Sequence, residues 1–227
     1  MLEQLTFADR NSQAAALARA VAADLRDALA LRGRSSLAVP GGTTPGAFLK
    51  ALSQERLDWS AVRVTLTDER CLPSSSPRSN QRLLGETLLQ DEAAAARFLP
   101  LYGEDLDQAM LADRLERDLL PLDVCVVGMG ADMHTASLFP KAEGLDEALA
   151  GAAPSLVRIT APGAPEPRIS LSAGVLRQAR KAYILIVGAA KQEALQRALE
   201  SGPASAAPIR VVLRREAPTA VYYSDAR

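Results

Sequence analysis

Short apolar runs alternate along the chain with longer segments in which apolar and polar residues recur at helical spacing. Residues 11–31 place Ala and Leu between Arg and Asp in a helical pattern, and Gly33 follows as a stop signal. Residues 123–127 and 182–187 contain continuous apolar runs of strand length, and a glycine follows each of them. The pattern predicts buried strands connected by amphipathic helices.

The remaining segments extend this alternation. Further strands are predicted at 36–39, 62–67, 155–160, 168–171 and 220–223. Further helices are predicted at 79–89, 105–119 and 190–200, from Pro45 onward, and after Leu171. Thr44 is expected to cap the helix that starts near Pro45, because threonine is a common N-cap residue. Proline in turn suits the first helical position. Residues 72–78 and 161–167 are rich in turn-forming residues and are predicted as loops.

Short apolar strands that alternate with helices are typical of an α/β fold. The expected architecture is a mostly parallel, Rossmann-like sheet covered on both faces. The 227 residues contain no internal repeat and no stretch long enough to link two domains, so we expect one domain over residues 1–227. Because such sheets bind ligands at the carboxyl ends of their strands, candidate functional residues should directly follow the strands.

Composition narrows the function classes. Lys and Arg total 26 against 27 Asp and Glu, so the chain lacks the basic excess typical of nucleic-acid binding. No apolar stretch reaches the roughly 20 residues needed to span a bilayer, and no signal-peptide pattern is present, so we expect a cytoplasmic protein without a membrane partner. One histidine and two cysteines, Cys71 and Cys125, indicate neither a disulfide framework nor a bound metal.

The segment Gly41-Gly42-Thr43-Thr44 lies between a predicted strand and a predicted helix. Glycines let the backbone approach a ligand, the helix N-terminus offers unpaired N–H groups, and Thr hydroxyls add donors. The segment is not a Walker A loop, because no Gly-Lys-Ser/Thr follows. It predicts either a phosphate cradle or an ordinary turn.

Asp68, Glu69 and Arg70 follow the strand at 62–67 directly. Three charged side chains directly after an apolar strand cost folding free energy unless they line a cleft. Arg70 could bind phosphate through two hydrogen bonds. The alternative is a structural cluster of salt bridges.

Lys191 and Arg168 are further candidates for anion binding. Lys191 lies in the first turn of a predicted helix, where a cation is unfavourable to the helix dipole unless an anion is bound nearby. Arg168 follows Pro167 at the start of a strand and is a weaker candidate of the same kind. A solvated side chain is the alternative for both.

His134 is the only histidine of the chain, and it lies in the Gly-rich segment after residues 123–127. That segment begins like a dinucleotide-binding fingerprint, but Met133 stands where the third glycine would be, so this interpretation fails. An imidazole at a carboxyl strand end suits general-base work near neutral pH, and Asp132 could orient the ring. His134 and Asp132 are therefore the candidate catalytic residues.

Residues 130–140, GADMHTASLFP, resemble the GxDGHTASLFP signature of the 6-phosphogluconolactonase family. Four other segments match that family in order and spacing, so the resemblance covers nearly the whole chain: PGGTTP at 40–45, TDERC at 67–71 with Ser79-Asn80 behind it, PRIS at 167–170 and GAAK at 188–191.

The resemblance implies a three-layer αβα fold of the sugar-phosphate isomerase, deaminase and CoA-transferase type. It implies hydrolysis of 6-phospho-D-glucono-1,5-lactone to 6-phosphogluconate without a cofactor, in the oxidative pentose phosphate pathway. The phosphorylated lactone would be the partner molecule. His134 would activate water, and loop N–H groups would face the oxyanion. Residues 41–44 with Arg70 and Lys191 would hold the phosphate.

Two segments depart from the family pattern. Met133 replaces the usual glycine, which restricts the backbone there but removes no reacting group. Residues 205–208 lack the Pro-Ala-Ser order often found before the last helix, so no site residue is assigned to them.

Three alternatives remain. A glucosamine-6-phosphate deaminase of the same fold resembles the chain at Asp68-Glu69 and around His134, but that family carries a Glu where this chain has Phe139. A sugar-phosphate sensing module would normally carry a DNA-binding domain, for which the chain has no spare length. A thiol hydrolase using Cys71 and His134 is the third, although attack by water needs no thiol.

Overall fold

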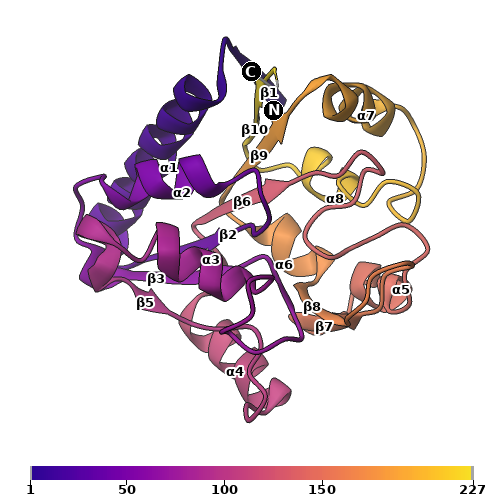
Figure 1. Cartoon of the computed structure of the whole chain (residues 1–227), viewed down its shortest axis with the longest axis horizontal. Coiled ribbons are helices and arrows are strands. Elements are labelled where there is room, and N and C mark those ends of the chain that lie inside the picture. Colours follow the sequence, from indigo (N-terminus) through magenta and orange to yellow (C-terminus); the bar gives the residue numbers. More distant parts are fainter. Residues whose placement is uncertain (1, 226–227) are drawn as a thin grey trace.

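In the computed structural model, which describes residues 2–225, the centre of the molecule is a parallel seven-stranded sheet (Figure 1). Its strand order is β1-β10-β9-β6-β2-β3-β5, and every neighbouring pair is parallel. The strands are β1 (Leu2–Phe7), β2 (Ser35–Val39), β3 (Val62–Leu66), β5 (Arg97–Phe98), β6 (Val124–Gly128), β9 (Lys181–Val187) and β10 (Thr219–Ser224).

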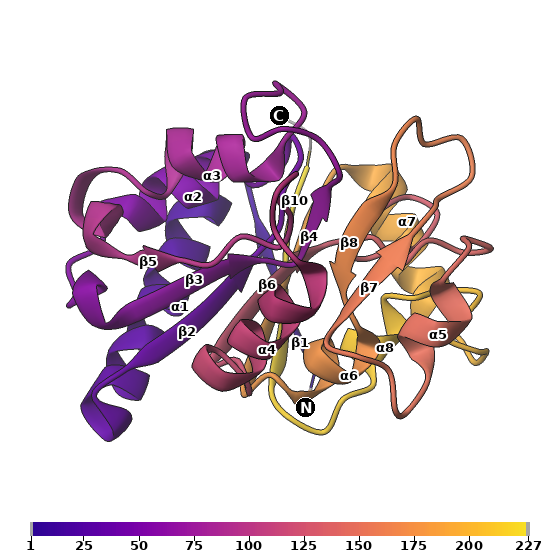
Figure 2. The same cartoon turned by 90° about the horizontal axis from the view of Figure 1, so that it is seen from below.

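Helices cover both faces of this sheet. The helix α1 packs against α2 on one face, whereas α6, α7 and α8 lie on the other (Figures 1 and 2). The arrangement confirms the predicted α/β fold with a covered, mostly parallel sheet. The helices are α1 (Arg10–Arg32), α2 (Gly46–Ser53), α3 (Asn80–Thr87), α4 (Gln108–Asp118), α5 (Leu145–Leu149), α6 (Ala173–Gln178), α7 (Ala189–Leu199) and α8 (Arg210–Leu213).

A second, smaller sheet is antiparallel and has three strands, in the order β4-β8-β7. These are β4 (Asp68–Arg70), β7 (Leu156–Ile159) and β8 (Arg168–Leu171). The predicted strand at 62–67 is therefore wrong at its end: β3 stops at Leu66, and the charged residues that follow belong to the small sheet. The small sheet places β4 directly beside β8, although the two strands lie far apart in the sequence.

The long helix α1 shows how local sequence sets an element. Asp9 caps its start by accepting hydrogen bonds from the backbone N–H groups of Asn11 and Ser12, both at 2.8 Å. Gly33 ends it at φ 67°, a left-handed conformation that favours glycine. The buried Gln13 donates to the carbonyls of Ile186 and Tyr222, which ties α1 to β9 and β10.

The strands of the large sheet supply much of the core. Side chains such as Leu37, Val126 and Ile184 are fully buried between the helical layers. Burial of each such side chain stabilises the fold by about 1.5–3 kcal/mol. The sheet is therefore a rigid base for the loops that leave its carboxyl edge.

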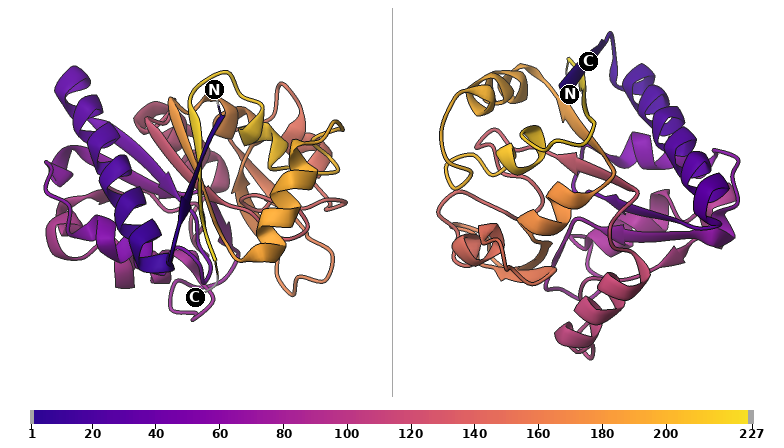
Figure 3. Two further views of the ribbon diagram at one scale, coloured as in Figure 1. Left: turned by 90° about the horizontal axis from the view of Figure 1, so that it is seen from above. Right: turned by 180° about the vertical axis from the view of Figure 1, so that it is seen from behind.

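Other differences from the sequence prediction have local causes. Thr44 does not cap α2; Pro45 occupies the N-cap position and no side chain bonds there. The edge strand β1 escapes prediction because its residues are half polar, as suits a strand at the outside of the sheet beside β10 (Figure 3). Also unpredicted are the two-residue strand β5 and the short helices α5 and α8. Over residues 2–225, none of the helices is long and apolar enough to cross a lipid bilayer.

Candidate active site

A cavity of about 220 Å³ opens where β2, β6 and β9 of the large sheet end beside β4 and β8 of the small one. This is the carboxyl edge at which ligands of parallel sheets are expected. Most of the residues singled out in the sequence line it: Gly41, Gly42, Thr43, Thr44, Asp68, Arg70, His134, Arg168 and Lys191. Two others, Asp132 and Glu69, do not line it.

The loop after β2 needs both of its glycines. Gly42 has φ 90°, where a side chain is strained. A Cβ on Gly41 would lie 1.9 Å from the side chain of Asn80, which itself donates a hydrogen bond to the Asp68 carbonyl at 2.8 Å. The glycines thus let the loop pack tightly against the start of α3, and this leaves Thr43 facing the cavity.

Arg70 and Arg168 are direct partners across the antiparallel pair β4–β8. Like charges in this position destabilise a sheet. Both side chains line the cavity, and the Nε atom of each is buried without a hydrogen-bond partner among the described residues. Burial lowers the pKa of Arg168, which reflects the cost of keeping this guanidinium charged. An anion bound in the cavity would reduce both the repulsion between the two guanidinium groups and the free-energy cost of keeping them charged while buried.

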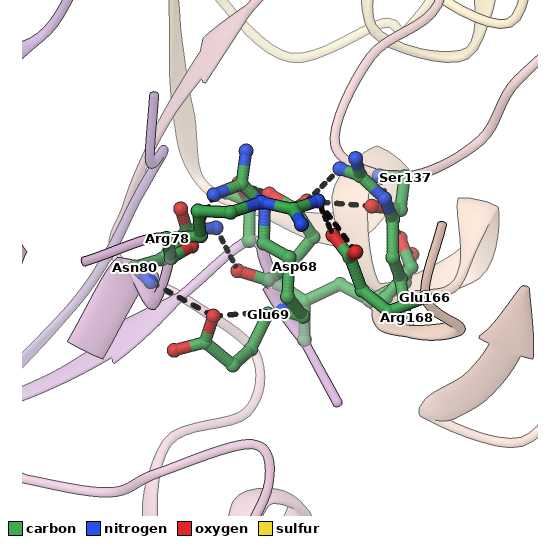
Figure 4. Close-up of polar contacts among 11 residues, drawn as sticks. Asp68, Glu69, Arg78, Asn80, Ser137, Glu166 and Arg168 are labelled. Carbon is green, nitrogen blue, oxygen red and sulfur yellow. Dashed lines mark hydrogen bonds and ion pairs between the residues drawn. The ribbon is translucent and has the colours of Figure 1, made fainter. Parts of the chain in front are cut away.

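Asp68 lies on the same side of β4 as Arg70 and is almost fully buried. Its carboxylate accepts a hydrogen bond from Ser137 Oγ at 2.5 Å, and its Oδ2 atom lies 3.9 Å from Nη1 of Arg168 (Figure 4). Asp68 therefore offsets part of the positive charge of the cavity wall.

Glu69 points away from the cavity, so its predicted place in the cleft is wrong. Its carboxylate accepts hydrogen bonds from the backbone N–H groups of Arg70, Asn80 and Gln81 and from Ser79 Oγ, at 2.6–3.0 Å. Burial raises its pKa, while these hydrogen bonds act in the opposite direction. Neighbouring residues of a strand point to opposite sides, and Glu69 consequently organises the start of α3.

His134 is held from two sides. Its Nδ1 atom lies 2.6 Å from Oδ1 of Asp132, and its ring stacks on Phe139 with the ring centroids 4.1 Å apart. The hydrogen bond from His134 is the main cause that lowers the pKa of Asp132. Because an ionised carboxylate can only accept, this contact favours the tautomer with its proton on Nδ1, and in the neutral imidazole Nε2 then has the lone pair that a general base needs. Asp132 thus orients the ring without lining the cavity.

The backbone before His134 is unusually confined. A Cβ on Gly130 would lie 2.2 Å from Nδ1 of His134, so only glycine fits there. Met133 has φ 67°, the left-handed region that favours glycine and costs other residues roughly 1–2 kcal/mol. Its carbonyl accepts a hydrogen bond from the backbone N–H of Ile209 at 3.1 Å, which helps to hold this conformation.

Lys191 lies in the first turn of α7 and lines the cavity. Burial is the main cause that lowers its pKa, and the charge of Arg10 acts in the same direction. No carboxylate is among the neighbours that shift this pKa. Lys191 therefore adds a third cation to the cavity wall.

Neither thiol has the surroundings of a nucleophile. Burial raises the pKa of the half-buried Cys71, and it raises the pKa of Cys125 to about 12. Cys71 does not line the cavity. Within residues 2–225, no three or more His, Cys, Asp or Glu side chains are grouped so that they could hold a metal ion.

Three residues that shape the site are not among the site residues predicted from the sequence. Ser137 donates a hydrogen bond to Asp68, and Phe139 stacks on His134; both lie in the segment of residues 130–140 that contains the histidine. Arg78 lies in a segment predicted only as a loop, yet its carbonyl accepts a hydrogen bond from Nη1 of Arg70.

Comparisons with known proteins agree with this geometry. The family model described as glucosamine-6-phosphate isomerases/6-phosphogluconolactonase matches residues 8–221. The 6-phosphogluconolactonase of Rhizobium meliloti (strain 1021) is 44% identical over 96% of this chain and 97% of that protein. The one of Pseudomonas aeruginosa is 44% identical over 93% of this chain and 90% of its own length.

Solved structures show the same fold. The crystal structure of a 6-phosphogluconolactonase from Shewanella baltica OS155 superposes with a TM-score of 0.94 at 36% identity, over 99% of this chain and 98% of that one. A monomeric glucosamine-6-phosphate deaminase shares the fold with a TM-score of 0.76 at 15% identity. The chain therefore belongs to the glucosamine-6-phosphate isomerase/6-phosphogluconolactonase family.

Proposed function

We propose that this protein hydrolyses 6-phospho-D-glucono-1,5-lactone to 6-phosphogluconate, a step of the oxidative pentose phosphate pathway. Relatives named 6-phosphogluconolactonase, at 33–46% identity over most of the chain, support this substrate. The observation that carries the proposal is the geometry of His134: an imidazole with a free Nε2 at a cavity whose wall carries three cations.

The cations define the phosphate end of the cavity. Arg70 and Arg168 are partners across two strands, and Lys191 from α7 lines the same cavity. The loop at residues 41–44 adds Thr hydroxyls and precedes the first turn of α2, whose N–H groups lack helical partners. Binding energy from the phosphate would position the lactone ring for reaction.

The chemistry follows from an ester carbonyl next to a neutral imidazole. Water attacks the lactone carbonyl carbon while Nε2 of His134 takes one of its protons, and the carbonyl oxygen becomes an oxyanion. The intermediate then collapses, the bond from the carbonyl carbon to the ring oxygen breaks, and His134 returns the proton to that oxygen. Asp132 stabilises the imidazolium between these steps. A positioned general base contributes about 10²–10⁴ in rate.

A deaminase activity has less support. Where the resemblance to deaminases calls for a Glu, this chain has Phe139, whose ring stacks on that of His134. That position therefore offers a phenyl face in place of a carboxylate for opening a sugar ring.

The proposal is tested with pure protein and fresh 6-phosphogluconolactone. Acid release is followed at constant pH against the spontaneous rate, and ammonia release from glucosamine 6-phosphate is measured in parallel. We expect acceleration of lactone hydrolysis and no ammonia. Ammonia release without lactonase activity would reverse the assignment, and neither activity in a protein that binds 6-phosphogluconate would favour a non-catalytic sugar-phosphate-binding module.

A further inference from the structure

Two loops at the rim of the cavity are joined by one ion pair. Arg78 lies in the loop between β4 and α3, and Glu166 lies in the loop between β7 and β8. The Nη2 atom of Arg78 is 2.6 Å from Oε1 and 2.5 Å from Oε2 of Glu166 (Figure 4). The Glu166 side chain is only 7% exposed, whereas that of Arg78 is 50% exposed. The pair thus fixes the Arg78 segment to a nearly buried carboxylate.

The main chain of Arg78 holds the head group of Arg70. The carbonyl oxygen of Arg78 accepts a hydrogen bond from Nη1 of Arg70, while Nε of Arg70 is buried without a partner among the described residues. The direction in which the Arg70 guanidinium points therefore depends on where Arg78 lies. The Arg78 side chain forms its ion pair with Glu166, and its backbone N–H donates to Ser76 Oγ within the same loop.

The charges around the rim fit this arrangement. Burial is the main cause that lowers the pKa of Arg168; the charges of Arg70 and Arg78 act in the same direction, whereas those of Asp68 and Glu166 oppose it. Arg78 pairs with Glu166 and Arg168 pairs with Asp68. Among residues 2–225, no carboxylate forms an ion pair with Arg70, so a bound anion would be its first charged partner.

We propose that the Arg78–Glu166 ion pair positions Arg70 to bind the phosphate of the substrate. The proposal rests on the proposed function for the identity of that phosphate. Arg78 and Glu166 are positioning residues, since they act through the Arg70 guanidinium and not on the reacting atoms.

The variant Glu166→Gln tests this most cleanly, because it keeps the shape of the side chain and removes its charge. The freed Arg78 side chain is half exposed and can be solvated. Removal of Arg78 would instead leave a buried carboxylate unpaired, which is more destabilising. Glu166→Gln should raise KM by roughly three- to tenfold and change kcat less than about twofold, because phosphate binding weakens while His134 is untouched.

The decisive measurement is a double-mutant cycle with Arg70→Ala. If Glu166 acts through Arg70, Glu166→Gln should change KM by less than about 1.5-fold in the Arg70→Ala background. Glu55→Gln is the matched control, because it breaks the Arg26–Glu55 ion pair of 2.8 Å, whose residues do not line the cavity. The Glu55→Gln variant should leave KM unchanged. An equal rise in KM in both backgrounds, or no rise in either, would overturn the proposal.

A binding measurement separates this proposal from the proposed function. Calorimetry with 6-phosphogluconate and with inorganic phosphate needs no turnover. Glu166→Gln should raise Kd in the wild-type background and leave it nearly unchanged in the Arg70→Ala background. If the wild type has no lactonase activity but the variants change Kd in this way, the proposed function is refuted and the role of the ion pair is supported. A wild type that binds neither anion would refute the ion-pair role as well. If Glu166→Gln does not fold, Glu166→Asp keeps the charge, shortens the reach and should shift Kd in the same direction.

Discussion

Replacement of the single histidine is the most direct test of the mechanism. His134→Asn keeps a similar size and some hydrogen bonding but has no group that can take a proton near neutral pH. The His134 side chain is 29% exposed, and its main apolar contact is the face of Phe139. The variant should therefore fold, because it loses part of one stacking contact and leaves the buried sheet intact.

The size of the effect follows from the role of the base. Loss of general-base catalysis should lower kcat by at least about 100-fold and at most about 10⁴-fold. At about 1.36 kcal/mol per factor of ten, this corresponds to about 2.7–5.4 kcal/mol in the activation barrier. The exposed fraction of the Asp132 side chain is 51%, so leaving it without its partner adds little to the cost in stability.

The assay must separate catalysis from folding and binding. Thermal unfolding reports the fold, calorimetry with 6-phosphogluconate reports binding, and acid release at substrate saturation reports kcat. A pH profile alone is ambiguous, because the second pKa of a phosphate ester is about 6 and lies in the range where an imidazole titrates. Near-normal kcat in a folded variant that binds product would refute His134 as the base. Asp68, the carboxylate that lines the cavity, would then be the next candidate.

Further substitutions test the remaining roles. Arg70→Ala and Lys191→Ala should each raise KM at least about tenfold, as expected for loss of a charged phosphate contact, and normal KM values in both would show that the phosphate binds elsewhere. Asp132→Asn should lower kcat about tenfold with KM little changed. The lowered pKa of Asp132 means that its ionised form stabilises the fold above its unfolded-state pKa; any difference in Tm between Asp132→Asn and the wild type should therefore disappear as the pH falls through the folded-state pKa. Cys71→Ser should keep full activity, because burial raises the pKa of this thiol away from neutrality, and an inactive Cys71→Ser enzyme would support a thiol mechanism.

Much of the site can be predicted because most of its residues directly follow strands of the parallel sheet. The carboxyl ends of parallel strands meet at one edge, so residues after β2, β6 and β9 have to converge once the strands are recognised. The sequence patterns place these strands to within one or two residues. His134, Lys191 and the loop at residues 41–44 accordingly line one cavity, as expected.

The error at Glu69 has a simple physical origin. Residues 62–67 have the pattern of one strand followed by charges, and that pattern does not distinguish Asp68, Glu69 and Arg70 from one another. These three residues form β4, and the twofold alternation of a strand sends Asp68 and Arg70 toward the cavity and Glu69 toward α3. Recognition of a separate strand at 68–70 would have assigned the two carboxylates to opposite faces from the sequence alone.

Contacts between distant segments cannot be predicted in this way. Arg78 and Glu166 are 88 residues apart, and each lies in a segment whose composition indicates only a loop. No periodicity connects them, since their meeting depends on how the small sheet brings β4 beside β8. Tertiary ion pairs of this kind follow from topology, which local patterns do not contain.

The position of Phe139 links the two chemical halves of the site. One half is the base on the loop after β6, and the other is the group of cations on the small sheet. The Phe139 ring stacks on His134 with centroids 4.1 Å apart, and the guanidinium carbon of Arg168 lies 5.2 Å from the centroid of the same ring. A cation over an aromatic face is attracted by its quadrupole, so one side chain contacts both the proposed base and a proposed phosphate-binding group. A carboxylate at this position would pair with Arg168 and compete with the substrate phosphate. In the proposed mechanism the phenyl ring therefore adds no second carboxylate beside Asp68 to pair with Arg168, while it stacks on the imidazole.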